Sequence, residues 1–439
     1  MKWICCQIGA RQHYAVPRAL QRENRLAALL TDFWAGPIIR GLAGNWAHSG
    51  IRSLAKRFHP ELDPTKQGKP KVETRGERHP TVNFQGSHLN SSISAVHSWN
   101  TRALWWEARL RRKAKTVGRY HGFIEVGHRF ACAVRSRLSR DDLTSPDTIV
   151  FAYDTGALEI FERCRDWGMK CVLDQMDPNR VEVELVQAEE KRWPGWTTHP
   201  IAVPEDYFHR REREWALADR VVVNSRWSAD ALVQQGVPRE KLFVMPLCYE
   251  VYDKHQKAEN ETRKSEKTLR VLFLGQVNLR KGIQYLMKAA RLLEQENIHF
   301  DVVGPVGISA EAVGSAPPNL TFHGRATRDQ TSAWYRQADL FVLPTLSDGF
   351  AITQVEAMSH SLPVITTPCC GEVVTEGMDG FIVPPGNADA LAQTFLRYIA
   401  QPDLVRAQRR AATLKAIQFT LDRMAENLIK LEEEIGNRR

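Results

Sequence analysis

Residues 338–391 read ADLFVLPTLSDGFAITQVEAMSHSLPVITTPCCGEVVTEGMDGFIVPPGNADAL. Two apolar runs in this stretch, 340–343 and 363–366, have the length of buried strands, and residues 352–360 between them have the apolar spacing of a helix. A strand, a helix and a second strand in this order are typical of a βαβ unit, which joins two parallel strands through a helix. The stretch therefore predicts a parallel α/β fold.

The same alternation extends in both directions from this stretch. In the C-terminal half it predicts strands at 269–274, 299–303 and 320–322 and helices at 283–295 and 328–337. In the N-terminal half it predicts strands at 148–153, 170–173 and 220–223 and helices at 156–167 and 226–235, the last one ended by Gly236. We therefore expect two doubly wound, Rossmann-like domains.

The domain limits follow from size and composition. A chain of 439 residues with 43% hydrophobic content is too long for one core and apolar enough for two. Residues 253–267, DKHQKAENETRKSEK, are almost devoid of apolar side chains, as an exposed connector would be. We therefore predict an N-terminal domain at 1–250 with irregular insertions at 40–100, a connector at 251–268, a C-terminal domain at 269–415, and a final helical segment at 416–439 that could cross back to the first domain.

Cysteine usage and hydropathy bear on the compartment. The eight cysteines stand singly or as neighbours, without a C-x-x-C pair or a His-rich partner segment, so we expect no metal site and a reducing environment. The opening MKWICCQIGARQHY becomes polar too early for a signal peptide, and no apolar run reaches the roughly 20 residues of a membrane span. We expect a cytoplasmic protein that is either soluble or peripheral at a membrane.

The net charge of +9 is concentrated in one stretch, since residues 102–140 are rich in Arg and Lys and contain only Glu107 and Glu125 as acids. Such a surface could meet nucleic acid, anionic lipid or a phosphorylated acceptor, or it could be a solvated helix face. No nucleic-acid-binding motif accompanies the charge. Within it, TRALWWEARLRRKAK (101–115) fits an interfacial helix with Leu104, Trp105, Trp106 and Leu110 at the boundary, and equally a core-packing helix.

Two loops in the C-terminal half have the features of an anion site, because helix N-termini at the carboxyl ends of parallel strands offer unpaired N–H groups. In the first loop, GQVNLRKG (275–282), Gly275 ends a strand and Arg280 and Lys281 stand at the start of the next helix. Two cations there suit a diphosphate that gains charge as it leaves a sugar. The alternative is that both are ordinary surface residues of a first helical turn.

The second loop is PTLSDGFA (344–351), where Gly349 permits close approach of a ligand and Asp348 can bond sugar hydroxyls. Glu356 follows eight positions after Asp348, on the predicted helix, so that one acid can face a hexose and the other a ribose. The alternative makes Asp348 a helix cap and Glu356 a buried structural acid.

These residues carry a resemblance to a known family. The stretch 338–391 resembles the donor-binding signature of retaining glycosyltransferases of family 4, which have the GT-B fold. FLGQVNLRKGIQYLMKAARLL (273–293) is similar to that family's phosphate-binding strand, loop and helix, and residues 212–247 to the end of its first domain. Together these segments cover about a quarter of the chain.

The resemblance implies a role for each matching residue. It makes Glu356 the acid that bonds the nucleotide ribose, Asp348 the acid that faces the donor sugar, and Arg280 with Lys281 the diphosphate clamp. The backbone from Gly349 through Phe350 and Ala351 to Ile352 would add N–H donors, Gly275 belongs to the phosphate loop, and Gly371 with Glu372 would line the nucleotide pocket.

The sequence departs from the family pattern at several positions. Asp348 stands where the family usually has the longer Glu, Gln276 where it often has Arg, and Gly9-Ala10 where it commonly has a Gly-Gly turn. A histidine of the first domain that contacts the donor sugar in many members has no clear counterpart. The candidates for its place are His13, Asp154 and Asp177.

The resemblance implies transfer of a hexosyl group, with retention at the anomeric carbon, from a nucleotide-diphosphate sugar to a glycan or lipid-linked acceptor in polysaccharide or envelope glycan synthesis. It also implies a cleft between two domains. No D-x-D triplet is present, so we expect no metal requirement and no other cofactor. The alternatives are another GT-B enzyme, such as a sugar-nucleotide epimerase, or a non-catalytic binding or scaffold protein with the same fold.

Overall fold

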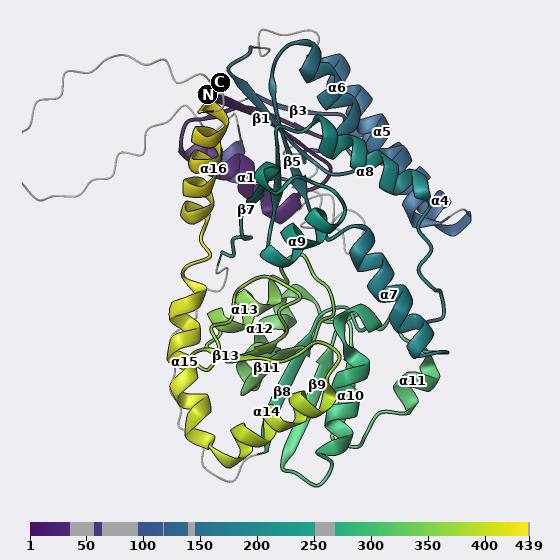
Figure 1. Cartoon of the computed structure of the whole chain (residues 1–439), viewed down its shortest axis with the longest axis vertical. Coiled ribbons are helices and arrows are strands. Elements are labelled where there is room, and N and C mark those ends of the chain that lie inside the picture. The colour runs from purple at the N-terminus through teal and green to yellow at the C-terminus, as the bar shows by residue number, and fades with distance from the viewer. Residues whose placement is uncertain (36–56, 64–94, 117, 139–144, 251–267, 438–439) are drawn as a thin grey trace, which may run out of the picture. The chain divides into compact units, whose positions relative to one another are not determined.

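The computed structural model describes residues 1–35, 57–63, 95–116, 118–138, 145–250 and 268–437. The chain divides into two compact units, and the boundary between them runs through a strand of the first sheet. The first unit comprises residues 1–172 and 216–218, and the second comprises 173–215 and 219–439. Figure 1 labels the elements of both units.

The first sheet has seven strands in the order β3-β2-β1-β4-β5-β6-β7. The pairs β1/β2, β1/β4, β2/β3 and β6/β7 are parallel, with Cys5 opposite both Leu29 and Phe151. The strands are β1 Lys2–Gln7, β2 Leu26–Thr31, β3 Ala95–Ser98, β4 Thr148–Tyr153, β5 Lys170–Gln175, β6 Arg220–Val223 and β7 Leu242–Val244. Its associated helices are η1 Arg11–Tyr14, α1 Ala15–Arg22, η2 Pro60–Leu62, α4 Asn100–Thr116, α5 Arg119–Leu138, α6 Leu158–Asp166, α7 Arg180–Arg192, α8 Glu205–Leu217, α9 Arg226–Gln234 and η3 Arg239–Lys241.

The second sheet has six parallel strands in the order β10-β9-β8-β11-β12-β13. They are β8 Leu269–Leu274, β9 Ile298–Val303, β10 Leu320–Gly324, β11 Leu340–Leu343, β12 Val364–Thr366 and β13 Gly380–Ile382. Helices connect and follow them: η4 Leu279–Lys281, α10 Ile283–Leu292, α11 Ala310–Gly314, α12 Arg328–Gln337, α13 Thr353–Ser359, α14 Ala388–Ala400, α15 Pro402–Ala416 and α16 Leu421–Gly436.

The strand order of the second sheet positions its functional edge. The chain moves outward from β8 through β9 to β10, then returns to the other side of β8 with β11. The loops that follow β8 and β11 therefore leave the same edge at the point where the order reverses, which is where open α/β sheets bind ligands.

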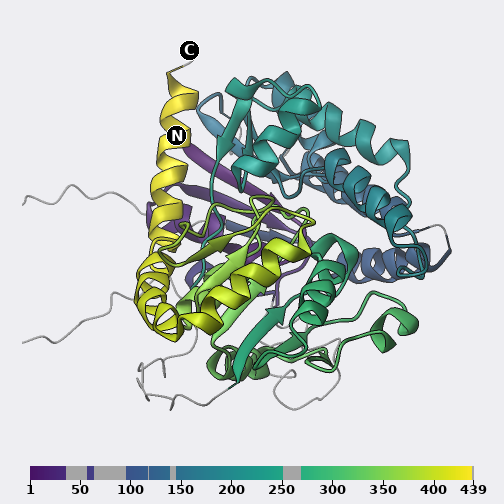
Figure 2. The ribbon, with the colours of Figure 1, turned by 60° about the horizontal axis from the view of Figure 1, so that its bottom comes forward.

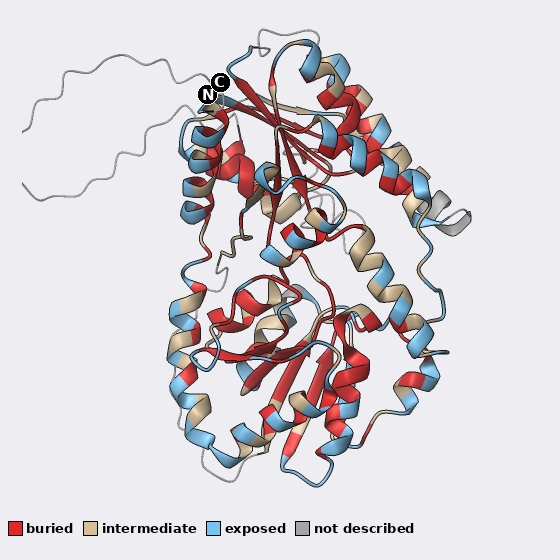
Figure 3. Ribbon diagram, in the orientation of Figure 1, coloured by how far each residue is buried: buried red, intermediate tan, exposed pale blue. Residues whose placement is uncertain are grey.

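The core of the second unit is made by the sheet and its helices. Phe273, Phe300 and Phe341 on three neighbouring strands are fully buried, and Figure 3 shows the buried residues concentrated in the strands. Burying a phenylalanine side chain contributes roughly 1.5–3 kcal/mol. Helices α10 and α14 contact each other and lie side by side in both ribbon views (Figures 1 and 2).

Most of the expected elements are confirmed. The strands at 148–153, 220–223, 269–274 and 340–343 and the helix at 328–337 have the predicted limits, and the other assigned strands and helices differ at their ends by a few residues. The short strand β13 and the edge strand β7 lie in segments that were given no strand, because three residues are too few to show a period.

The predicted domain limits remain a prediction. The connector at 251–268 lies outside the described residues except for Thr268, and the irregular stretch 40–100 is described only at 57–63 and 95–100. The final helical segment forms α16, whose Glu434 is 2.9 Å from the guanidinium of Arg220 on β6.

The basic helix α4 packs two of its four expected boundary residues, Trp106 and Leu110, within the first unit. Trp106 is buried and Leu110 lies against Gly122 of α5, so one face of α4 packs within the first unit. Leu104 and Trp105 are each 49% exposed and do not share that face. The helix therefore has a packed side and a solvent side that carries two large apolar residues.

Candidate functional site

The loop after β8 is shaped by capping and by close backbone contact. The side chain of Asn278 accepts a hydrogen bond of 3.1 Å from the amide of Lys281, which caps the short helix η4. Gly282 has φ +74°, and a Cβ at this position would collide with the carbonyl of Pro344. The amide of Leu346 donates to the carbonyl of Arg280 over 2.9 Å. The loops after β8 and β11 are thus bound to each other.

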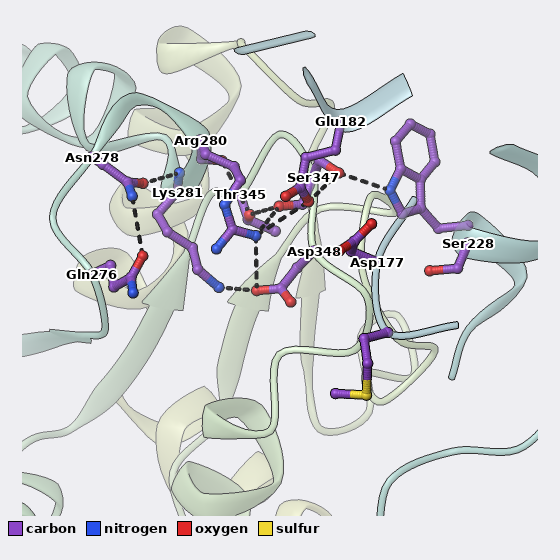
Figure 4. A network of polar contacts seen from close by, with 12 residues as sticks. Asp177, Glu182, Ser228, Gln276, Asn278, Arg280, Lys281, Thr345, Ser347 and Asp348 are labelled. Carbon is purple, nitrogen blue, oxygen red and sulfur yellow. Dashed lines mark hydrogen bonds and ion pairs between the residues drawn. The ribbon is translucent and has the colours of Figure 1, made fainter. Parts of the chain in front are cut away.

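This contact brings the two predicted cations to the predicted acid. Figure 4 shows the ammonium of Lys281 paired with Oδ2 of Asp348, and Nη1 of Arg280 lies 3.9 Å from the same oxygen. Nη1 of Arg280 also donates to the carbonyl of Ser347 over 3.0 Å. The arrangement places two positive groups and one carboxylate together at the carboxyl edge of the second sheet.

The charge state of Lys281 is sensitive to this environment. Burial, together with the neighbouring charge of Arg280, lowers the pKa of its ammonium to about 7. Cys370 and Glu182 oppose the shift because a negative charge nearby favours the charged ammonium. A diphosphate would raise the pKa of Lys281 in the same way.

Gly349 is fixed by its neighbours. A Cβ there would lie 2.5 Å from the carbonyl oxygen of Met176 and 2.8 Å from the side-chain amide of Asn224, so only glycine fits. Ala351 follows with φ +58°, a strained value for a residue with a Cβ. Phe350 between them is buried against Phe419, and Ile352 is the N-cap of α13. The structure therefore offers the backbone of this segment, rather than the Phe350 side chain, to a ligand.

Glu356 lies in the first turn of α13 and is only partly buried. Its Oε2 accepts a hydrogen bond of 2.9 Å from the hydroxyl of Tyr335, whose pKa is raised by burial and by the charge of Glu356. The Tyr335 ring stacks on His360 at 4.9 Å between centroids. The carboxylate therefore has a fixed partner on one oxygen.

The loops after β8, β9 and β10 meet at Gly304. Its amide donates to the carbonyl of Gly324 over 2.8 Å, and a Cβ on it would collide with the carbonyl of Gly275. Gly275 itself has open space where a Cβ would be. Beside this junction is a pocket of about 340 Å³ lined by Val303, His323, Gly324, Arg325, Ala326, Gln330, Ala333, Trp334 and Gln337.

Three other predicted positions have protein partners. The carboxylate of Glu372 accepts a 3.0 Å hydrogen bond from the amide of Arg226 at the start of α9. Gly371 faces the ring of Phe350 so closely that a Cβ would collide with it. Gln276 accepts a 3.4 Å hydrogen bond from Asn278, so it supports the loop that carries Arg280.

The candidates associated with the first sheet follow three of its strands, β1, β4 and β5. In the first unit, the amide of Gly9, with φ +75°, donates to Asp32 over 2.8 Å, and His13 stands in a run of left-handed residues with φ +52°. Asp154 is buried directly after β4. Asp177 belongs to the second unit, where it accepts hydrogen bonds from Arg211 over 2.9 Å and from the amide of Asn179 over 2.8 Å.

Sequence reasoning missed Glu182, Ser347 and Trp227. Oε2 of Glu182 on α7 is 3.3 Å from Nη1 of Arg280 and accepts a 3.0 Å hydrogen bond from the Ser347 hydroxyl. Trp227 donates to the same hydroxyl over 3.3 Å. Glu182 lies 98 positions before Arg280 in an acidic helix, and nothing in its local sequence distinguishes it from an exposed acid.

Neither a metal-binding cluster nor a membrane-spanning helix is found in the described part of the chain. No group of three or more His, Cys, Asp or Glu side chains there is arranged to hold a metal ion. No described helix combines the length and the hydropathy needed to cross a membrane.

Residues 268–401 match the family model described as "Glycosyl transferases group 1". The chain contains a glycosyl transferases group 1 domain. This domain holds Arg280, Lys281, Asp348 and Glu356 together with the loops that position them.

Curated relatives agree with the match of the group 1 domain. The chain is 25% identical over 206 residues to the amylovoran biosynthesis glycosyltransferase AmsK of Erwinia amylovora, covering 43% of this chain and 50% of that protein. It is 26% identical over 232 residues to the D-inositol 3-phosphate glycosyltransferase of Streptomyces bingchenggensis, covering 47% and 51%. The chain thus spans about half the length of the curated relatives it matches.

Solved structures show the fold of the whole chain. The sucrose-phosphate synthase of Thermosynechococcus elongatus superposes with a TM-score of 0.59 at 16% identity, covering 100% of both chains. Anabaena HepE in complex with UDP and glucose superposes with a TM-score of 0.56 at 12% identity, covering 98% of this chain and 99% of that one. The two parallel-sheet, Rossmann-like regions therefore have the GT-B fold, as expected.

Proposed function

We propose that the protein is a retaining glycosyltransferase of family 4 that moves a hexosyl group from a nucleotide-diphosphate sugar to a glycan or lipid-linked acceptor in polysaccharide or envelope glycan synthesis. The observation that carries the proposal is the cluster of Arg280, Lys281 and Asp348 at the strand-order reversal of the group 1 domain. Support also comes from relatives named as glycosyltransferases and from HepE, which was solved with UDP and glucose.

In this proposal, Arg280 and Lys281 bind the diphosphate and stabilise the charge that develops as the sugar–phosphate bond breaks. The two cations supply the positive charge that a divalent ion supplies in other transferases, so we propose a metal-independent reaction. The backbone from Gly349 to Ile352, at the start of α13, adds N–H groups, and the open space beside Gly275 lets a phosphate approach the loop after β8 closely. Asp348 leaves its contact with Lys281 to bond hydroxyls of the donor sugar.

The remaining parts of the donor have matching groups nearby. The carboxylate of Glu356, held on one oxygen by Tyr335, bonds the ribose hydroxyls. The pocket beside Gly324 accepts the base, because the rings of His323 and Trp334, whose centroids are 4.3 Å apart, supply aromatic surface in its lining, and the loops of Gly275 and Gly324 meet at Gly304. A planar heterocycle in this pocket would be continuous with a diphosphate at the loop after β8.

Retention is the finer part of the proposal. The acceptor hydroxyl attacks on the face that the diphosphate leaves, and a phosphate oxygen of the departing group takes the acceptor proton. This step requires no protein nucleophile, so the protein contributes by positioning and by charge stabilisation. The support is that the two acids observed in contact with the cations, Asp348 and Glu182, are already paired with Lys281 and Arg280.

On the acceptor side we propose peripheral contact with an anionic membrane through α4 and α5. Trp105 is 49% exposed and lies under the guanidinium groups of Arg109 and Arg129, at 5.3 and 4.8 Å from the ring centroid. Phe123 on α5 is also exposed. An exposed aromatic residue beside cations is typical of helices that lie in a membrane interface.

The test is donor turnover. Incubation with UDP-, GDP- and ADP-sugars should give slow release of the nucleotide diphosphate from one of them, without added metal and in the presence of EDTA. Arg280→Ala should abolish release, whereas Arg291→Ala, an exposed arginine of α10, should not. Inversion in the transferred product would contradict retention, and an altered sugar still bound to nucleotide would favour an epimerase.

A further inference from the structure

Helix α7 directs two acids at the phosphate loop of the group 1 domain. Glu182 and Glu189 are seven positions apart, so they lie on one face of the helix. Glu189 accepts hydrogen bonds of 3.0 Å from Gln284 and 2.8 Å from the hydroxyl of Tyr285, both on α10. Glu182 contacts Arg280 on η4. This face of α7 therefore contacts both η4, through Glu182, and α10, through Glu189.

Glu182 is part of a closed set of contacts around Arg280. Its Oε2 accepts the Ser347 hydroxyl over 3.0 Å and lies 3.3 Å from Nη1 of Arg280, and the same Nη1 donates to the Ser347 carbonyl over 3.0 Å (Figure 4). Both contacts use Nη1. Nε and Nη2 of Arg280 make no hydrogen bond to any residue that the structure describes, and so these donors stay available to a ligand.

The backbone of Arg280 is anchored as well. Its carbonyl accepts the amide of Leu346 over 2.9 Å and the hydroxyl of Thr345 over 3.2 Å. With the main chain fixed at one end and Nη1 fixed at the other, the guanidinium has little rotational freedom. Holding a flexible side chain in this way removes entropy that a ligand would otherwise have to remove on binding.

We propose that Glu182 is a positioning residue of the donor site, which fixes the guanidinium of Arg280 so that Nε and Nη2 meet the diphosphate. This inference rests on the proposed function, because it assumes that the ligand of Arg280 is a nucleoside diphosphate. It adds a third acid to Asp348 and Glu356, supplied from outside residues 268–401 that match the group 1 domain.

The surroundings of Glu182 agree with this role. Burial raises the pKa of its carboxyl, and Asp177 acts in the same direction, while Arg280, Ser347 and Lys281 lower it. A buried carboxylate destabilises the folded protein unless a charged or hydrogen-bonding partner compensates for its lost hydration. Glu184 on the same helix is exposed and provides a matched control.

The test is isothermal titration of the nucleoside diphosphate and of the matching nucleoside, which lacks phosphates. Glu182→Ala should weaken the diphosphate about tenfold and leave nucleoside binding unchanged, since contacting residues couple by about 0.5–3 kcal/mol. Glu182→Gln keeps a hydrogen-bond acceptor but removes the charge. Its diphosphate affinity should lie between those of the wild type and Glu182→Ala. Glu184→Gln should bind like the wild type.

A double-mutant cycle distinguishes positioning from general destabilisation. In an Arg280→Ala background, the additional change Glu182→Ala should have no further effect on diphosphate affinity. Equal losses in both backgrounds, equal losses for the nucleoside, or wild-type affinity in Glu182→Ala and Glu182→Gln would overturn the inference while diphosphate binding itself stands. Failure of the wild type to bind any nucleoside diphosphate would instead overturn the proposed function.

Discussion

Lys281 and Asp348, 67 positions apart in the sequence, form an ion pair at the carboxyl edge of the second sheet. The pair exists because β8 and β11 are neighbours, so that the loops after them leave the sheet side by side. A diphosphate bound to Lys281 would replace a carboxylate as its partner and free Asp348 for the sugar. In the proposed function, the pair would therefore couple the binding of a diphosphate at Lys281 to the release of Asp348.

The lowered pKa of Lys281 predicts a pH dependence of binding. In the free protein its ammonium is lost as the pH rises through about 7, whereas a bound diphosphate favours the charged form. Diphosphate affinity should therefore fall above about pH 7, and binding there should take up a proton. Calorimetry in buffers of different ionisation enthalpy measures this uptake. Lys281→Arg, which stays protonated, should lose the dependence, and an unchanged pH profile in this variant would reject the role of Lys281.

Changes at Asp348 should separate sugar chemistry from nucleotide binding. Asp348→Asn should lower turnover about 10- to 100-fold, since it removes the acid that we propose to face the sugar, with a smaller change in diphosphate affinity. Asp348→Glu, which restores the length common in the family, should keep turnover but shift the preference among donor sugars. Steady-state kinetics with a donor panel measure both effects. A loss of diphosphate affinity as large as the loss of turnover would contradict the sugar role.

The close packing around Gly349 predicts that a side chain at this position destabilises the protein. Gly349→Ala places a Cβ 2.5 Å from the carbonyl of Met176, so backbone must shift, at a cost of about 1–3 kcal/mol in the free energy of unfolding. Gly314→Ala, where a Cβ meets no atom within 4 Å, is the control and should be neutral or slightly stabilising. Urea denaturation compares the two variants. Equal stabilities would mean that the loop adapts without cost.

The fold could be predicted from sequence further than the site could. Runs such as 271–273 and 340–343 are buried on both faces and so appear as continuous apolar segments, which made the parallel sheets predictable. Arg280, Lys281 and Asp348 were found because each follows such a strand. Glu182 was not, since its role depends on how α7 packs, which its acidic helical sequence does not encode. The partners of Glu372 and Asp177 likewise come from distant segments.

The exposed side of α4 predicts a membrane interaction. Trp105→Ala combined with Leu104→Ala should lower binding to vesicles rich in anionic lipid about 3- to 10-fold. Both changes remove exposed apolar area that the wild type would bury in the membrane interface. Leu414→Ala, an exposed leucine of α15, is the control and should bind as the wild type does. Co-sedimentation at two salt concentrations measures binding. Absence of wild-type binding at low salt would exclude an anionic membrane surface and leave a soluble acceptor.

The most direct measurement is thermal unfolding of the wild type and of Glu356→Ala with UDP, GDP and ADP and their common sugar conjugates. A ligand that binds the native state raises the melting temperature. One nucleotide, with its conjugates, should stabilise the wild type and should stabilise Glu356→Ala much less, because the variant lacks the ribose acceptor beside Tyr335. If none of the nucleotides shifts the wild-type transition, the proposed use of a nucleotide-sugar donor is contradicted and a non-catalytic role for the fold takes its place.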